Sequence, residues 1–125
     1  MEIKTVIVSA LILPFLAIPS EPVVYIATPT ETILAEVTAY SEFDSCHYEN
    51  CIMASGKRAY VGALACPRNI SLETRVFIDG KEYVCEDRTN KDLNGRFDIF
   101  MGYGKESYQK AIEFGLQRKN VVIHR

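Results

Sequence analysis

Two aspartates, Asp87 and Asp98, stand eleven positions apart beside apolar, strand-like segments. Phe97 and Ile99 flank the second aspartate directly, and an apolar run leads into the first. An ionised carboxylate among buried apolar residues is costly unless it is paired or used in a reaction. Two such carboxylates joined by one short connection are a candidate acid–base site.

The two candidate carboxylates need different environments to do chemistry. Asp98 can act as an acid near neutral pH only if its pKa lies well above the ordinary value of about 3.9. Apolar neighbours and a charged Asp87 would raise that pKa, whereas Arg88 and Arg96 would lower it if they pointed inward. In a purely structural alternative, Asp87 accepts backbone hydrogen bonds and Asp98 pairs with one of these arginines. The residues alone leave both interpretations open.

The bulk composition indicates one small globular domain. The chain has 125 residues, of which 48% are hydrophobic and 24% charged, and its formal net charge is −2. A nucleic-acid-binding protein would normally carry a clustered basic face, and no basic run is present. We therefore expect a monomer that binds no nucleic acid and needs no cofactor.

The N-terminal segment differs from the rest of the chain, because residues 5–19 form an uncharged run. This run is shorter than the roughly 20 apolar residues of a membrane-spanning helix, and its length is typical of a secretory signal. An uncleaved membrane anchor and a buried core helix are the alternatives. We expect a signal peptide or anchor at 1–20, a linker at 21–35 and an exported domain at 36–125, placed outside the cell, in the wall or at the membrane.

The four cysteines, Cys46, Cys51, Cys66 and Cys85, all follow the export segment. An even number of cysteines in a small exported domain predicts disulfides, and four cysteines allow three pairings. We favour Cys46–Cys51, which closes a short loop, and Cys66–Cys85, which joins two strand-like segments. A zinc site that includes His47 is the alternative, but the cysteine spacing is loose for zinc, and we expect no metal.

Short strands make up most of the expected domain. Alternating or apolar β-forming patterns cover 36–40, 60–65, 74–78, 81–85 and 121–123. Asp79 and Gly80 separate the third and fourth of these strands, and this dipeptide favours a type I′ hairpin turn, so Asp79 is expected to be structural.

One segment, 106–117, has a helical period. Tyr108, Ala111 and Ile112 fall on one face, and Gly115 is a typical helix stop. Several short strands with one helix near the C-terminus predict a small, mainly β barrel.

Six motifs, in this order, resemble the three-aspartate (3D) domain family. They are Val37-Thr38-Ala39-Tyr40, Ala54-Ser55-Gly56, Ile70 to Val76, Glu86-Asp87-Arg88, Gly95 to Phe100, and Ala111-x-x-Phe114-Gly115. The resemblance covers nearly all of 36–125. It implies a six-stranded double-psi β-barrel similar to the C-terminal part of the membrane-bound lytic transglycosylase A family. It also implies peptidoglycan glycan strands as the substrate, cleaved at O-glycosyl bonds without water.

The same resemblance implies roles for particular residues. The last family aspartate, within a Gly-Arg-x-Asp-Ile pattern, is the catalytic acid–base and corresponds to Asp98, and the middle one corresponds to Asp87. Four residues are expected to bind substrate, the first three because their segments flank the cleft of this fold. These are Tyr40, Ser55, Lys57 and Arg88, although Lys57 is equally interpretable as a solvated surface lysine.

Two positions depart from the family pattern. Cys66 stands where the first family aspartate belongs, and Glu73 stands where the family usually has a glycine. A turn that needs a positive φ tolerates glutamate poorly, so the local backbone at Glu73 is expected to differ. The missing aspartate favours an alternative function, a non-catalytic peptidoglycan-binding or wall-loosening module of the expansin-like type.

Overall fold

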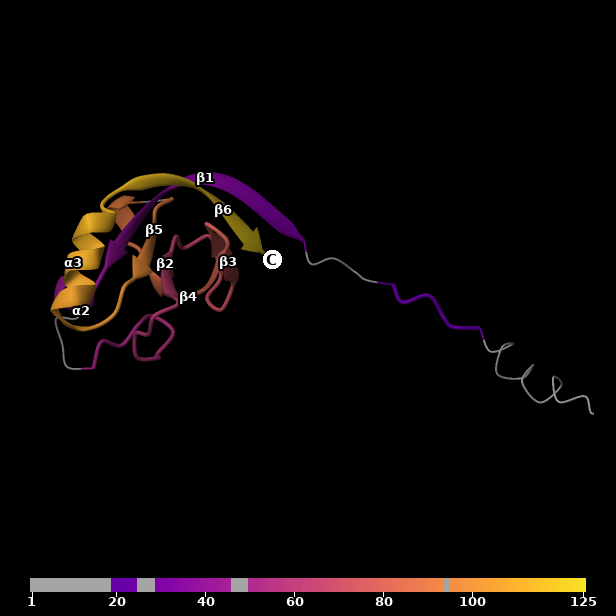
Figure 1. Ribbon diagram of the computed structural model, residues 1–125, viewed down its shortest axis with the longest axis horizontal. Coiled ribbons are helices and arrows are strands. Elements are labelled where there is room, and N and C mark those ends of the chain that lie inside the picture. Colours follow the sequence, from indigo (N-terminus) through magenta and orange to yellow (C-terminus); the bar gives the residue numbers. More distant parts are fainter. Residues whose placement is uncertain (1–18, 25–28, 46–49, 94) are drawn as a thin grey trace, which may run out of the picture.

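A computed structural model describes residues 19–24, 29–45, 50–93 and 95–125 (Figure 1). Six strands close into a barrel in the order β1-β5-β2-β4-β3-β6. Their bounds are β1 (Thr30–Tyr40), β2 (Ala63–Cys66), β3 (Arg75–Ile78), β4 (Lys81–Arg88), β5 (Phe97–Phe100) and β6 (Gln117–His124). The helical elements are α2 (Glu42–Ser45), the 3-10 turn η2 (Lys91–Leu93) and α3 (Gly104–Phe114). The predicted mainly β, closed six-stranded barrel with one helix near the C-terminus is confirmed.

Strand β1 begins at Thr30, six residues before the start expected from the sequence. It pairs antiparallel with β6 from Thr30 opposite His124 to Val37 opposite Gln117, and Figure 1 shows the two long ribbons side by side. The first three residues of β1 are polar and exposed, so they lack the apolar alternation that marks a strand. Because residues 30–35 pair with β6, they belong to the barrel wall and not to the linker assigned from the sequence.

The predicted export segment falls mostly outside the described residues, because residues 1–18 are not among them. Within the described ranges, the structure contains no helix with the length and apolar character needed to cross a membrane. The division into a signal or anchor, a linker and a domain stays a prediction, except that β1 already begins at Thr30 within the predicted linker.

One face of each strand fills the barrel interior. The buried side chains there are Ala35, Val37, Leu64, Cys66, Ile70, Val76, Ile78, Cys85, Phe97, Ile99, Val121 and Ile123. Cys66 of β2 and Cys85 of β4 form a disulfide within this core, which confirms that predicted pair. Cys46 and His47 lie outside the described residues, so the Cys46–Cys51 disulfide stays a prediction.

The β3–β4 hairpin turns at Asp79 and Gly80, whose φ angles are 51° and 75°. Two positive φ angles at the central positions are what a type I′ turn requires, as the dipeptide predicted. The Asp79 carboxylate pairs with Lys119 of β6, which gives this aspartate a structural contact.

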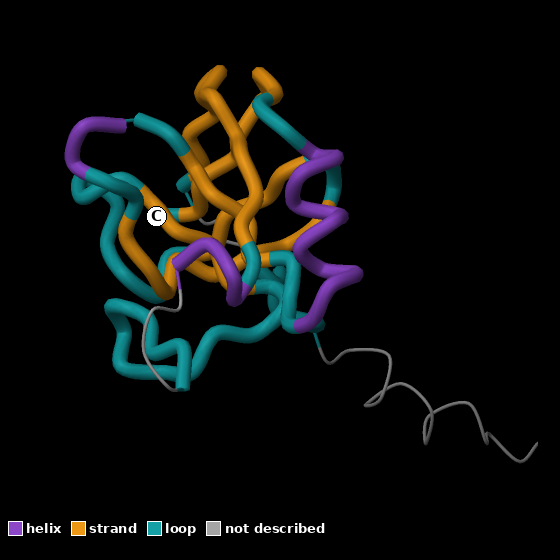
Figure 2. Tube along the Cα trace, turned by 90° about the vertical axis from the view of Figure 1, so that its left-hand side faces the viewer, coloured by secondary structure: helices purple, strands orange, loops and turns teal. Residues whose placement is uncertain are grey.

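Helix α3 lies along one side of the strands, where Figure 2 shows it as the longer purple coil. Its end at Gly115, with φ of 61°, agrees with the predicted stop. Of the three residues that share one predicted face, Ala111 is buried, whereas Tyr108 and Ile112 are exposed. Strand side chains fill most of the barrel interior, so α3 packs on the outside and buries few of its own side chains.

A second buried cluster lies on the outer face of the barrel, under the loop 50–62. Its members are Tyr40, Cys51, Met53, Ala59, Ala63, Ala65 and Phe100. The predicted strand at 60–65 is shorter than expected, because regular pairing begins only at Ala63. Strand β4 extends three residues beyond its predicted end, to Arg88, and so includes Asp87.

Candidate active site

Strand pairing brings the two candidate aspartates to either side of one alanine. Ala65 of β2 is in register with Asp98 of β5 and with Asp87 of β4. Register partners on neighbouring strands point to the same side of a sheet, so both carboxylates share the outer face with Ala65. Neighbouring strands lie about 4.8 Å apart, which puts the two aspartate backbones roughly 10 Å apart. We call the surface formed by Asp87, Ala65 and Asp98 the carboxylate face.

A shift in register between β2 and β4 decides which way Asp87 points. Leu64 pairs with Cys85, but Ala65 pairs with Asp87, so Glu86 is an extra residue with no partner on β2. Strict alternation from the inward Cys85 would turn Asp87 into the barrel interior. The extra residue instead directs Asp87 outward, as β-bulges beside functional sites often do.

Asp87 is held by three hydrogen bonds. Its Oδ1 accepts from the backbone N–H groups of Ala54, at 3.1 Å, and Arg88, at 2.9 Å. Its Oδ2 accepts from the Tyr40 hydroxyl at 3.3 Å. Burial, followed by the charges of Asp87 and Asp98, raises the pKa of Tyr40 far above its usual range, so the hydroxyl keeps its proton. Tyr40, expected to contact sugar, thus orients Asp87 through its polar atom.

Asp98 has a different environment from Asp87, because in the described structure its carboxyl group accepts from one side chain and from no backbone N–H group. The Thr38 hydroxyl of β1 lies 3.0 Å from its Oδ1. Burial raises the pKa of Asp98 from 3.8 to about 6, and the charges of Asp44 and Asp87 add to this rise. The hydrogen bond from Thr38 and the charge of Arg96 lower the pKa but do not cancel the rise. Asp98 can therefore hold or release a proton near neutral pH.

Asp44 is a nearby carboxylate that the sequence analysis missed. It lies in the short helix α2, directly after β1, and its Oδ2 accepts from the backbone N–H of Ser41 at 2.8 Å. The charge of Asp44 raises the pKa of Asp98 because α2 places the two carboxylates near each other. The sequence gives no signal for that placement beyond the acidic residues themselves.

The structure argues against the ion pairs that formed the purely structural alternative for Asp98. Arg96 forms a salt bridge with Glu36, with 2.9 Å between Nη2 and Oε2. The guanidinium of Arg88 donates to the backbone carbonyls of Pro67, at 2.9 Å, and Ile70. Arg88, expected to bind substrate, therefore fixes the connection after β2 instead of facing the carboxylate face with free donors.

Ser55 and Lys57 lie in the loop that covers the outer cluster, and Glu86 ties this loop to β4. The fully buried Glu86 accepts from the Tyr60 hydroxyl at 2.9 Å and pairs with the Lys57 ammonium at 3.3 Å. The backbone N–H of Ser55 donates to the Glu86 carbonyl at 2.8 Å. Burial, then the Glu86 carboxylate, raises the pKa of Tyr60 to about 12. The Lys57 side chain remains 58% exposed, so it is anchored yet accessible.

Cys66 occupies the opposite face of β2 from Ala65. It is fully buried, belongs to the interior core and is bonded to Cys85. A carboxylate at this position would point into the barrel, away from Asp87 and Asp98. The departure at Cys66 therefore takes no side chain from the carboxylate face.

Glu73 adopts the left-handed backbone conformation that favours glycine. Its φ is 72°, so the expectation of a different local backbone is wrong. Its N–H donates to the Cys85 carbonyl at 2.7 Å, a bond that holds the turn in this conformation despite the side chain.

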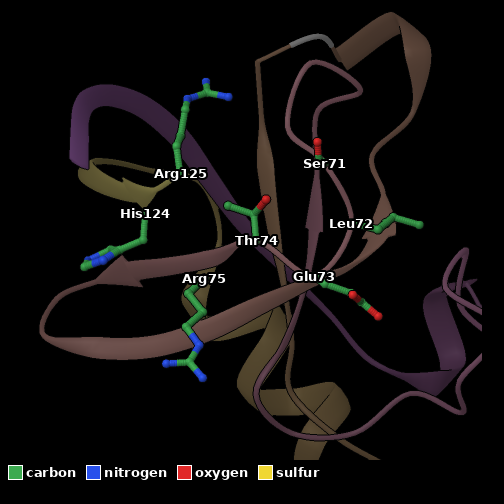
Figure 3. Close-up of a pocket in the computed structure, with 7 residues that line it drawn as sticks. All are labelled: Ser71, Leu72, Glu73, Thr74, Arg75, His124 and Arg125. Carbon is green, nitrogen blue, oxygen red and sulfur yellow. The ribbon is translucent and has the colours of Figure 1, made fainter. Parts of the chain in front are cut away.

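A separate hollow of about 590 Å³ lies near the C-terminal end of β6 (Figure 3). Its lining residues are Ser71, Leu72, Glu73, Thr74, Arg75, His124 and Arg125, and we call it the arginine hollow. The guanidinium groups of Arg75 and Arg125 point away from each other in Figure 3. They pair with Glu82, at 3.3 Å, and Glu31, at 2.9 Å. The hollow therefore lacks a set of polar groups that converge on one point.

No protein-family model and no curated protein sequence matches this chain. Among solved structures, the chain is similar to the Escherichia coli lytic transglycosylase MltA in an apo form, with a TM-score of 0.51 and 16% identity. The match covers 63% of this chain and 28% of that chain, so this protein spans well under half of MltA. At this identity the similarity shows an MltA-like barrel fold, and membership of the 3D family stays a prediction.

Proposed function

We propose that this protein cleaves the glycan strands of peptidoglycan by a lytic-transglycosylase-type reaction, with Asp98 as the acid–base. One observation carries the proposal: the half-buried carboxyl of Asp98 shares the outer face of the barrel with the firmly held carboxylate of Asp87, on either side of Ala65. Burial raises the pKa of Asp98 to about 6, which agrees with an acid–base role. The barrel's similarity to MltA, itself named a lytic transglycosylase, supports peptidoglycan as the substrate class. Such a substrate and the disulfide agree with an exported protein.

The proposed reaction needs one residue that first gives and then takes a proton. Protonated Asp98 donates to the glycosidic oxygen while the bond from that oxygen to the muramoyl anomeric carbon breaks. The C6 hydroxyl of the same sugar attacks this carbon and passes its proton to the Asp98 carboxylate. A 1,6-anhydro ring and a free hydroxyl on the departing sugar result, and Asp98 regains its proton. No water is consumed, so the second carboxylate of a hydrolase is not required.

Asp87 has an orienting and electrostatic role in this proposal. Its three hydrogen bonds fix its position, and its charge helps to keep Asp98 protonated. A fixed negative charge near the anomeric carbon also favours the positive charge that develops there. Of the predicted substrate contacts, Ser55 and Lys57 are proposed to meet the substrate, because the Lys57 ammonium is accessible to an anionic muramoyl group. Tyr40 is proposed to orient Asp87 through its hydroxyl, and Arg88 to hold the connection after β2 through the Pro67 carbonyl.

The direct test is digestion of purified sacculi by the full chain and by its Asp98→Asn variant, with products identified by mass spectrometry. We expect soluble anhydro-muropeptides from the wild type and none from the variant, with circular dichroism showing that both are folded. Products with free reducing ends would indicate hydrolysis and contradict the mechanism.

A second candidate function is a non-catalytic wall-binding or wall-loosening module of the expansin-like type. The sequence feature that favours it is the missing first family aspartate, replaced by Cys66, although this position lies in the barrel interior and not on the carboxylate face. This function predicts that both proteins sediment with sacculi and that neither releases products.

A further inference from the structure

Thr38 touches the carboxyl group of Asp98 from the neighbouring strand. The two residues are register partners in the parallel β1–β5 pair, and 3.0 Å separates Thr38 Oγ1 from Asp98 Oδ1. The only other acceptor near this hydroxyl in the described structure is the Phe97 carbonyl, at 3.5 Å. A threonine hydroxyl has one proton to donate. The shorter and charged acceptor, Oδ1, receives that proton when Asp98 is ionised.

The second carboxyl oxygen of Asp98, Oδ2, is left open. Within the described residues, no protein group donates to it, and the one fully buried side-chain oxygen without a partner is Oε1 of Glu86. Oδ1 therefore has a donor from β1, whereas Oδ2 has none among the described residues. The two oxygens of this carboxyl group are not equivalent.

We infer that Thr38 is a positioning residue for Asp98: its hydroxyl holds Oδ1, so that the transferable proton resides on Oδ2. This inference rests on the proposed function for its catalytic meaning, and on the Thr38–Asp98 contact for its geometry. The same bond restricts rotation of the carboxyl group, which keeps Oδ2 in one position when the substrate binds.

The hydrogen bond from Thr38 also favours proton transfer. A hydrogen bond to a carboxylate is stronger than one to a carboxyl group, so it strengthens as Asp98 releases its proton. An interaction that strengthens on the way to the transition state accelerates the step. Thr38 and Arg96 act in this direction, whereas burial, Asp44 of α2 and Asp87 of β4 oppose ionisation. Tyr40 keeps its proton and adds no charge on this side.

The inference is tested first without substrate, by following the side-chain carboxyl carbon of Asp98 by NMR as the pH changes. Thr38→Val removes the donor but keeps the β-branched shape, Thr38→Ser keeps the hydroxyl, and Thr32→Val changes an exposed threonine of the same strand. We expect the pKa of Asp98 to rise in Thr38→Val and to stay close to wild type in the other two. An unchanged pKa in folded Thr38→Val would overturn the inference.

The catalytic part is tested by the rate of anhydro-muropeptide release as a function of pH. A hydrogen bond to a charged group contributes about 1.5–3 kcal/mol, so Thr38→Val should slow release by roughly ten-fold or more, and Thr38→Ser should restore most of it. Equal rates for Thr38→Val and wild type would contradict a positioning role. If the wild type releases nothing, the proposed function fails, but the NMR titration still decides whether Thr38 sets the proton position.

Discussion

The arginine hollow and the carboxylate face lie on the same barrel, but only one of them is organised for chemistry. The hollow has a volume of about 590 Å³ and two arginines, yet each arginine is satisfied by a separate glutamate. On the carboxylate face, by contrast, the polar groups converge. Thr38 donates to Asp98, and Tyr40 and two backbone N–H groups donate to Asp87. Convergent polar groups and a perturbed pKa are better indicators of a site than volume.

The largest expected effect is a loss of glycan cleavage when the carboxylate face is changed, but not when the arginine hollow is changed. Asp98→Asn should lower glycan cleavage by about 10²–10⁴-fold, the range for losing a general acid–base group. Arg75→Gln in the arginine hollow should leave the rate close to wild type, because its guanidinium pairs with Glu82 at the surface. Both are measured as initial rates of muropeptide release. A larger loss from Arg75→Gln than from Asp98→Asn would reverse the comparison.

The same Asp98→Asn substitution should stabilise the fold at neutral pH. The folded-state pKa of about 6 exceeds the unfolded value of 3.8, so the native state binds more protons between these values. Stability is therefore lost as pH rises through that window, by up to about 3 kcal/mol for roughly two pKa units. Urea unfolding at pH 7 should show that the neutral amide removes this cost, with the difference from wild type shrinking below about pH 4. As a control, Asp92→Asn makes the same substitution at an exposed aspartate outside the carboxylate face.

Features that depend on neighbouring residues were predictable from the sequence. The Asp79-Gly80 turn and the stop at Gly115 each follow from local conformation. The Cys66–Cys85 disulfide was the favoured one of three possible pairings, because it joins two strand-like segments. The barrel itself follows from several short strands and the order of the motifs. Local rules suffice here because turns, helix ends and core positions are set over a few residues.

Features that depend on register could not be predicted. The contact of Thr38 with Asp98 joins residues sixty positions apart, and the outward direction of Asp87 depends on one extra residue, Glu86. A bulge changes which face every later residue of the strand occupies, and the sequence of β4 alone does not locate it. The carboxylates were therefore identifiable as residue types, but the groups that tune and orient them were not.

A smaller effect concerns the loop 50–62, which covers the outer cluster. Tyr60→Phe removes a hydrogen bond to the fully buried Glu86, whose Oε1 already lacks a partner among the described residues. Leaving a buried charge less satisfied should cost about 1–3 kcal/mol of unfolding free energy. Tyr108→Phe is the matched control, because Tyr108 is 39% exposed against 38% for Tyr60, and its hydroxyl has no hydrogen-bond partner in the described structure. Equal unfolding free energies for the two variants would show that Glu86 does not anchor this loop.

The smallest effect belongs to the arginine hollow, where Glu73 is held at a φ of 72°. A non-glycine residue in the left-handed region costs roughly 1–2 kcal/mol, whereas glycine loses about 0.5–1 kcal/mol through its more flexible unfolded state. Glu73→Gly should therefore stabilise the protein by up to about 1 kcal/mol in urea unfolding, without changing glycan cleavage. Glu73→Ala removes the same carboxylate but keeps the Cβ, so it should give no such gain. An equal gain from alanine would assign the cost to the charge of Glu73 instead of its backbone. A loss of cleavage in Glu73→Gly would mean that the arginine hollow takes part in the reaction after all.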